Sequence, residues 1–137
     1  MTEVRILVVD DFAPFRSYVC RLLEGRSEWR IIGEAGDGDT ALRMATELRP
    51  DLILLDIGLP RLNGIEVAEQ LATAVPSCRI VLVTSNCALD VVQKAFEIGA
   101  MAYVLKWNAD RDLLPAIAAA IEGKRFMSER NSGCQPI

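Results

Sequence analysis

The chain has 137 residues, of which 51% are hydrophobic and 25% are charged, and its formal net charge is −4. This length suits one globular domain with a substantial core, and the acidic balance argues against nucleic-acid binding by this chain itself. The absence of histidine excludes histidine metal ligands and nucleophiles activated by histidine. No apolar run approaches the roughly 20 residues of a membrane span and the start lacks a secretion signal, so we expect a cytoplasmic protein.

Short apolar runs alternate with segments of helical periodicity along the chain. The runs predict five strands, over Val4–Val9, Arg30–Ala35, Leu52–Leu55, Ile80–Val83 and Met101–Leu105. Apolar residues at helical spacing follow each run, beginning with Phe15, Val19 and Leu22 after the first. Strict alternation of strand and helix predicts an α/β fold with a parallel sheet and helices on both faces.

The composition of the strands indicates their order. The first, third and fourth runs are almost continuously hydrophobic, as central parallel strands are, whereas Arg30, Gly33 and Glu34 place the second at an edge. This agrees with a flavodoxin-like doubly wound (βα)5 fold, whose five-stranded parallel sheet has the order 2-1-3-4-5. Helical periodicity ends near Lys124, so residues 1–124 are predicted to form the domain and residues 125–137 a tail or the start of an interdomain linker.

Polar residues occur where the predicted strands end. Asp10 and Asp11 follow the first strand, Asp56 follows the third, Thr84 follows the fourth and Lys106 follows the fifth. Taken singly, each has an ordinary explanation as a helix cap, a loop residue or a solvated lysine. In the order 2-1-3-4-5, however, all of them lie at the edge where doubly wound sheets bind ligands. We therefore interpret them as one site.

The chemistry of these residues favours a metal ion and a phosphoryl group. Clustered carboxylates repel one another unless a metal or a paired lysine neutralises them. Oxygen ligands without histidine or cysteine favour Mg²⁺ or Ca²⁺ over zinc, and a small open site that keeps several waters suits Mg²⁺. Mg²⁺, the Lys106 ammonium and the Thr84 hydroxyl would form a pocket for a phosphoryl group, with the Asp56 carboxylate as the nucleophile.

Four motifs follow one another along the chain: ILVVDD at residues 6–11, LILLDIGLPRLNG at 52–64, IVLVTS at 80–85 and GAMAYVLK at 99–106. In these motifs the sequence resembles the receiver domain of two-component response regulators, and the likeness covers residues 3–124. The final helix and the GKRF that follows it are most similar to receivers of regulators that carry a LuxR-type helix-turn-helix output domain.

The resemblance implies a role for each residue of the site. Asp56 would accept a phosphoryl group from the phosphohistidine of a sensor histidine kinase. Asp10 and Asp11 would bind Mg²⁺ together with Asp56 and the backbone carbonyl of Gly58, and Lys106 would bind a phosphoryl oxygen. Such a chain is a signalling switch and not an enzyme for other substrates, since it catalyses only its own aspartyl phosphorylation and dephosphorylation.

The resemblance also implies a conformational change and its partners. Thr84 would move toward the phosphate and Tyr103 would rotate inward with it, which alters the surface of the fourth helix, fifth strand and fifth helix. A homodimer would form through that surface or through the first and fifth helices. A DNA-binding output domain beyond this chain would make the switch regulate transcription. Trp107 stands where many members have proline, which leaves open the geometry of the peptide after Lys106.

Other classes of function fit the sequence less well. A haloacid-dehalogenase-like phosphatase needs a second aspartate two positions after its nucleophile, where this chain has Gly58. A flavin- or nucleotide-binding module needs a first loop rich in Gly, Ser or Thr, whereas DDFAP carries two acids. The main alternative is a receiver-like interaction module that works without phosphate. For the leading hypothesis, the bare Gly58 and the nearby Asn86 predict an aspartyl phosphate of moderate to short life.

Overall fold

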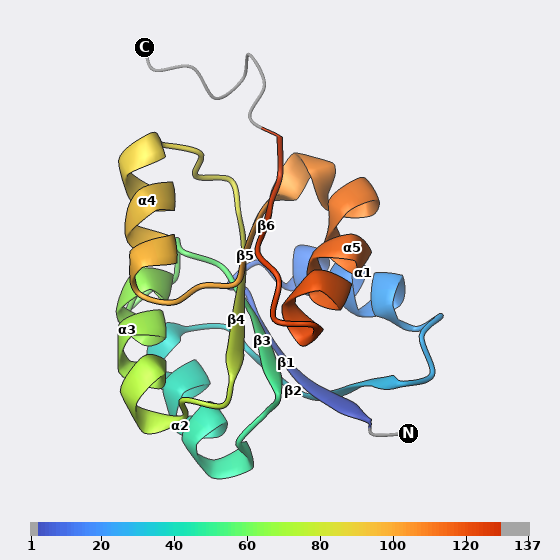
Figure 1. Ribbon diagram of the computed structural model, residues 1–137. Coiled ribbons are helices and arrows are strands. Elements are labelled where there is room, and N and C mark those ends of the chain that lie inside the picture. Colours follow the sequence, from blue (N-terminus) through green and yellow to red (C-terminus); the bar gives the residue numbers. More distant parts are fainter. Residues whose placement is uncertain (1–2, 130–137) are drawn as a thin grey trace.

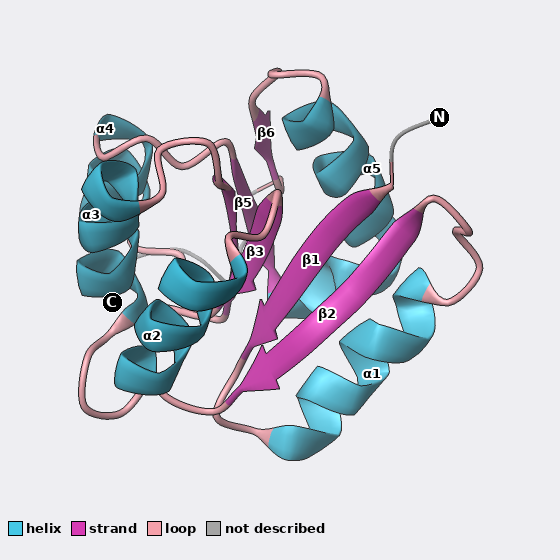
Figure 2. Cartoon of the chain, turned by 90° about the horizontal axis from the view of Figure 1, so that it is seen from below, coloured by secondary structure: helices cyan, strands magenta, loops and turns pink. Residues whose placement is uncertain are grey.

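The fold is built on one parallel sheet. In the computed structural model, which describes residues 3–129, a six-stranded sheet has the order β2-β1-β3-β4-β5-β6 with every neighbouring pair parallel. Figure 2 shows β1 and β2 side by side at one edge of this sheet. Its strands are β1 (Val4–Val9), β2 (Trp29–Ala35), β3 (Leu52–Leu55), β4 (Arg79–Thr84), β5 (Ala102–Leu105) and β6 (Phe126–Met127). The predicted flavodoxin-like class and the order 2-1-3-4-5 are confirmed, and β6 extends the sheet at the β5 edge.

Helices cover both faces of this sheet. Figure 1 shows one group of helices on one face and a second group on the other. The first group is α2 (Gly38–Leu48), α3 (Gly64–Ala74) and α4 (Leu89–Glu97), and the second is α1 (Ala13–Leu23) and α5 (Ala109–Ile121). A short 3-10 helix, η1 (Lys106–Asn108), leads from β5 into α5. Within residues 3–129, no helix is long and apolar enough to cross a lipid bilayer.

Two hydrophobic cores hold the layers together. Successive side chains of a strand point to opposite faces, so Leu7 and Ile53 pack under α2, α3 and α4, whereas Ile6 and Leu52 pack under α1 and α5. All residues of β3 are buried, as expected for a central parallel strand that is covered on both faces. A strand held this firmly fixes the position of the residue that follows it, Asp56.

The register of the sheet brings the carboxyl ends of the strands together. Val9 of β1 and Leu82 of β4 both pair with Leu55, the last residue of β3. Thr84 at the end of β4 pairs with Leu105 at the end of β5. The residues that follow these strands therefore emerge at one edge of the sheet, beside the point between β1 and β3 where the winding reverses.

The segment after α5 forms a strand that the sequence pattern did not predict. Phe126 and Met127 pair with Ala102 and Tyr103 of β5, and the amide of Ser128 donates to the Tyr103 carbonyl at 2.9 Å. Two hydrophobic residues in a polar segment are too few to show a period. The boundary predicted after residue 124 stays a prediction, and residues 130–137 of the predicted tail lie outside the described part of the chain.

Candidate functional site

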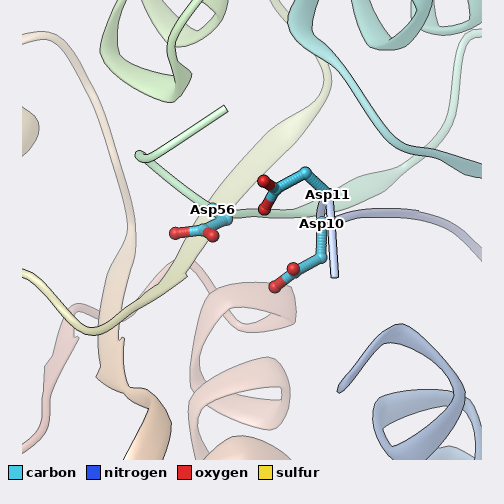
Figure 3. Close-up of side chains that lie close together, drawn as sticks. All are labelled: Asp10, Asp11 and Asp56. Carbon is cyan, nitrogen blue, oxygen red and sulfur yellow. The ribbon is translucent and has the colours of Figure 1, made fainter. Parts of the chain in front are cut away.

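Three carboxylates meet at the carboxyl edge of the sheet. Asp10 and Asp11 follow β1 and Asp56 follows β3, and each offers an oxygen within 4.8 Å of the others (Figure 3). Asp10 and Asp56 are buried, with exposed fractions of 3% and 6%, whereas Asp11 is exposed to solvent. The structure thus places together three acids from two strands, and the exposed one leaves the cluster open to water.

The ammonium group of Lys106 lies between the two buried carboxylates. Its Nζ atom is 2.8 Å from Asp10 Oδ2 and 3.0 Å from Asp56 Oδ2. A positive charge at these distances offsets the repulsion between the acids. Together, three ionised carboxylates and one ammonium carry a net charge of −2, which a divalent cation would neutralise.

Burial and pairing shift the pKa values of Asp10 and Lys106. Burial raises the pKa of Asp10 above its ordinary 3.8, because this effect exceeds the opposing hydrogen bonds from Lys106 and from the Phe12 amide. Burial is the largest single effect on the pKa of Lys106 and would lower it, but the hydrogen bonds and the charges of Asp10 and Asp56 together outweigh burial and raise that pKa above 10.5. Lys106 therefore stays charged at neutral pH.

Hydrogen bonds from the start of α1 hold Asp10 in place. The Phe12 amide donates to Asp10 Oδ1 at 2.8 Å, and Arg16 Nη1 donates to the Asp10 backbone carbonyl at 2.6 Å. Arg16 also pairs with Glu34 of β2 at 3.0 Å. Pro14 lies in the first turn of α1, where its missing amide hydrogen is not needed. The loop between β1 and α1 is therefore tied to both the helix and the sheet.

The loop between β3 and α3 is constrained in a similar way. The Asp56 amide donates to the Val9 carbonyl at 3.1 Å, and the Gly58 amide donates to Asp56 Oδ1 at 3.3 Å. Gly64 begins α3 so close to this loop that a Cβ atom there would lie 2.1 Å from the Asp56 carbonyl oxygen. At Gly58, by contrast, a Cβ atom would have no neighbour within 4 Å, so the space beside Asp56 is open.

Thr84 and Tyr103 both bond to Asn86 in the loop between β4 and α4. The Thr84 hydroxyl accepts a hydrogen bond from the Asn86 amide at 3.3 Å, and the Tyr103 hydroxyl donates to the Asn86 carbonyl. Tyr103 is fully buried, with its ring centroid 6.5 Å from that of Phe96. The Asn86 side chain accepts from the Ala88 amide at 3.0 Å. The two residues expected to act as a switch thus meet at one backbone position.

Lys106 and Trp107 open the 3-10 turn that follows β5. The peptide between them is trans, which answers the question that the missing proline raised. The Trp107 side chain turns outward and is 45% exposed. The lysine therefore points into the acidic cluster while its neighbour faces solvent.

The carboxyl edge of this doubly wound sheet carries three acids that lie close together and a lysine that pairs with two of them. These features define a class, the flavodoxin-like α/β domains with an acidic site where the winding of the sheet reverses. Within this class, the family model of the response regulator receiver domain matches residues 6–118. The chain belongs to this family and is a receiver domain of the two-component response regulators.

The chain is similar to parts of longer regulatory proteins. It is 33% identical to the transcriptional regulatory protein LiaR of Bacillus subtilis (strain 168) over 130 residues, which cover 95% of this chain and 62% of LiaR. It is 38% identical to the nitrate/nitrite response regulator protein NarL of Escherichia coli (strain K12) over 125 residues, 90% of this chain and 57% of NarL. The chain thus spans little more than half the length of either relative.

A solved structure supports the same relationship. The two-component response regulator of the LuxR family from Aurantimonas sp. SI85-9A1 has a TM-score of 0.87 and 35% identity, and the match covers 93% of this chain and 91% of that one. The likeness to receivers of LuxR-type regulators, expected from the end of the sequence, is confirmed.

Sequence reasoning missed two residues of α1 that contact the site, Arg16 at the Asp10 backbone carbonyl and Phe15 at the Lys106 ammonium group. Arg16, which binds the Asp10 carbonyl, has the pattern of an ordinary helix-surface cation, and Phe15 has the pattern of a core residue. Their place in the sequence could have identified them, because both lie in the first turn of the helix that follows Asp10 and Asp11. Residues at this position are near the carboxyl end of β1 whatever their local role.

Proposed function

We propose that this chain is a phosphorylation-controlled switch whose Asp56 accepts a phosphoryl group from the phosphohistidine of a sensor histidine kinase in a Mg²⁺-dependent reaction. The strongest support is the position of Asp56 Oδ2, 3.0 Å from Lys106 Nζ at the end of a fully buried strand. A nucleophile on such a strand stays at a fixed point beside a cation, which favours an oriented attack.

The proposed transfer uses groups that the site already contains. An Asp56 carboxylate oxygen attacks the phosphorus, the bond between phosphorus and the histidine nitrogen breaks, and Asp56 becomes an acyl phosphate. The Lys106 ammonium would bind an oxygen of the transferred group and stabilise the charge spread over it. The Thr84 hydroxyl would turn from the Asn86 amide and donate a further hydrogen bond to that group.

The donor set suits Mg²⁺. Asp10, Asp11 and Asp56 offer oxygen atoms within 4.8 Å of one another, and hard oxygen ligands in an open site are those that Mg²⁺ prefers. We propose the Gly58 backbone carbonyl as a further ligand. When bound, Mg²⁺ would supply positive charge beside the phosphoryl oxygens. The Lys106 ammonium would keep the two buried acids from repelling each other before the metal binds.

The proposed switch element is the contact of Thr84 and Tyr103 with Asn86. Movement of the Thr84 hydroxyl toward the phosphate would release the Asn86 amide, and Tyr103 would respond because it bonds the carbonyl of the same residue. The altered surface comprises α4, β5 and α5, and a homodimer would form there or through α1 and α5. Because β6 pairs along β5, the first of these surfaces includes β6.

The proposed setting is a cytoplasmic two-component system that regulates transcription. LiaR, which is named a transcriptional regulatory protein, extends well beyond the part that this chain matches, which supports a DNA-binding output domain outside it. The chain itself would catalyse only its own phosphorylation and the hydrolysis of its phosphate. The sensor kinase would be its phosphodonor partner.

Intact mass after incubation with acetyl phosphate and Mg²⁺ tests the proposal. The wild type should gain one phosphoryl group, and Asp56→Asn should gain none. Asp39→Asn, which alters an exposed acid in the first turn of α2, should behave as the wild type. No phosphate on the wild type, or an undiminished amount on Asp56→Asn, would reject the proposal. Dimerisation that ignores both the phosphodonor and Asp56→Ala would favour the phosphorylation-independent module instead.

A further inference from the structure

The ammonium group of Lys106 makes a further contact, with an aromatic ring. Its Nζ atom lies over the Phe15 ring, 4.6 Å from the centroid. A cation within about 6 Å of a ring centroid is attracted by the electron-rich face of the ring. The Lys106 side chain is only 19% exposed, so little water competes for this attraction.

Phe15 is held in a fixed position relative to the acids. Its amide donates to the Phe12 carbonyl at 3.0 Å, and the Phe12 amide in turn donates to the Asp10 carboxylate at 2.8 Å. The next residue, Arg16, binds the Asp10 carbonyl at 2.6 Å. The ring centroids of Phe15 and Tyr18 are 5.8 Å apart. The loop that carries Asp10 therefore also determines where the ring meets Lys106.

The ring differs from the carboxylates in how it behaves during the proposed reaction. Asp10 would bind Mg²⁺ and Asp56 would take the phosphoryl group, so both acidic partners of Lys106 would change their charge or their contacts. A phenyl ring has no ionisable group and offers Mg²⁺ no oxygen ligand. Its attraction for the ammonium group therefore persists when the acids engage other partners.

A simple packing role is the competing explanation for Phe15. The side chain is partly buried against the core beneath α1 and α5, and a leucine would fill much of the same volume. Leucine, however, has no electron-rich face, so in Phe15→Leu the Lys106 ammonium group would keep only its contacts with the two carboxylates. Phe15→Leu therefore separates the two roles, and Phe15→Tyr restores a ring.

We propose that Phe15 is a positioning residue for Lys106, whose ring holds the ammonium group at the site while Asp10 and Asp56 engage metal and phosphate. The kinetic consequence rests on the proposed function, whereas the contact itself does not. Without the ring, the flexible lysine side chain would spend more time toward solvent. Phosphoryl transfer to Asp56 would then be slower.

Nuclear magnetic resonance of the lysine side chains tests the contact. The ε-methylene protons of Lys106 should resonate upfield, because they lie near the face of the Phe15 ring. Lys94 and Lys124 serve as internal references, since their side chains are 51% and 73% exposed. The Lys106 resonance should move toward the reference values in Phe15→Leu and stay upfield in Phe15→Tyr.

Phosphorylation kinetics test the consequence. With acetyl phosphate and Mg²⁺, where acetate leaves as Asp56 is phosphorylated, the rate should fall about fivefold in Phe15→Leu and recover in Phe15→Tyr. Mono-, di- and trifluorinated phenylalanine at position 15 should lower the rate progressively. Each added fluorine withdraws electron density from the ring face and so weakens its attraction for the ammonium group, with little change in the shape of the ring.

The outcomes are distinct. Equal rates across the fluorinated series at position 15, or a Lys106 resonance that does not respond to Phe15→Leu, would overturn the proposal. A wild type that takes no phosphate would overturn the proposed function. The Lys106 resonance would then still show whether the ammonium group lies over the Phe15 ring. If Phe15→Leu unfolds, the fluorinated series still decides, since it keeps the ring volume.

Discussion

The Ser128 hydroxyl donates to Asp112 Oδ2 at 2.7 Å and accepts from the Leu105 amide at 3.0 Å. Both Ser128 and Asp112 are buried. Because Leu105 directly precedes Lys106, the segment after α5 is bonded to the end of the strand that carries the lysine of the site. The packed part of the chain therefore includes Ser128. Its hydrogen bond to the Leu105 amide helps to hold β5 in position from the side of β6.

Ser128→Ala should lower the free energy of unfolding by about 2 kcal/mol, because a buried amide and a buried carboxylate lose a hydrogen-bond partner. Unfolding in urea, followed by circular dichroism, measures the change. Ser27→Ala is the matched control, since Ser27 is exposed in the turn before β2, and it should change the free energy by less than about 0.5 kcal/mol. Equal effects of the two substitutions would show that the Ser128 bonds contribute little.

Asp112 should make the stability depend on pH in acid. The hydrogen bond from Arg111 has the largest effect on the pKa of Asp112 and lowers it. Burial opposes this effect, but the hydrogen bond from Ser128 and the charge of Arg111 add to it, so the pKa lies below its ordinary 3.8. A carboxyl with a lower pKa in the folded chain contributes stability above its unfolded pKa and loses it as the pH falls through the folded pKa. The difference in unfolding free energy between the wild type and Asp112→Asn should be constant above about pH 5 and shrink below about pH 4.

Urea unfolding of both proteins at a series of pH values measures this difference. Comparing the two cancels the contributions of the other carboxyl groups, which titrate in both. A difference that stays constant down to about pH 2 would mean that the folded chain does not lower the Asp112 pKa.

Two glycines near Asp56 should differ strongly in how much an alanine substitution destabilises the fold. Gly64→Ala should lower the free energy of unfolding by about 3 kcal/mol or more, because its Cβ atom would lie 2.1 Å from the Asp56 carbonyl oxygen and force the backbone apart. Gly58→Ala should change it by less than about 1 kcal/mol, since no atom lies within 4 Å of the added carbon. Similar values for the two variants would contradict the close packing of α3 against the loop.

Local sequence pattern was sufficient to predict the strands and the place of the site. The apolar runs over Val4–Val9 and Leu52–Leu55 coincide with β1 and β3, because a run buried on both faces ends abruptly at the first acid. The meeting of Asp10 with Asp56 follows from the strand order, since neighbouring parallel strands end at the same edge. No contact between side chains had to be known for this step.

Contacts between distant elements could not be predicted in the same way. Phe15 fits the apolar face of a helix, and Ser128 lies in a polar segment without a period, so each has an ordinary local explanation. Their partners, Lys106 and Asp112, are distant in the sequence, and the contacts depend on rotamers and on how α1 and β6 dock. Neither hydrophobic periodicity nor motif spacing specifies these quantities.

Mg²⁺ should stabilise the folded chain through Asp11. A ligand that binds only the folded state at 100 times its Kd adds about 2.7 kcal/mol to the free energy of unfolding. Asp11→Asn should lose most of this gain, and because Asp11 is exposed the variant should still fold. Asp39→Asn, which changes an exposed acid on α2, should keep the gain. Thermal unfolding with Mg²⁺ and with a chelator measures it, and a full gain in Asp11→Asn would contradict the proposed ligand set.

Gly58→Met should lengthen the life of the aspartyl phosphate. Hydrolysis needs a water molecule to attack the phosphorus, which releases inorganic phosphate and restores the Asp56 carboxylate. Position 58 has open space around its missing side chain, so a methionine can lie beside Asp56 and hinder the water without disturbing the fold. Gly25→Met is the control, because Gly25 also has open space but lies after α1. Intact mass after removal of the phosphodonor should show slower loss of phosphate in Gly58→Met than in the wild type or Gly25→Met. Equal decay in these three proteins would show that access of water at position 58 does not limit the lifetime.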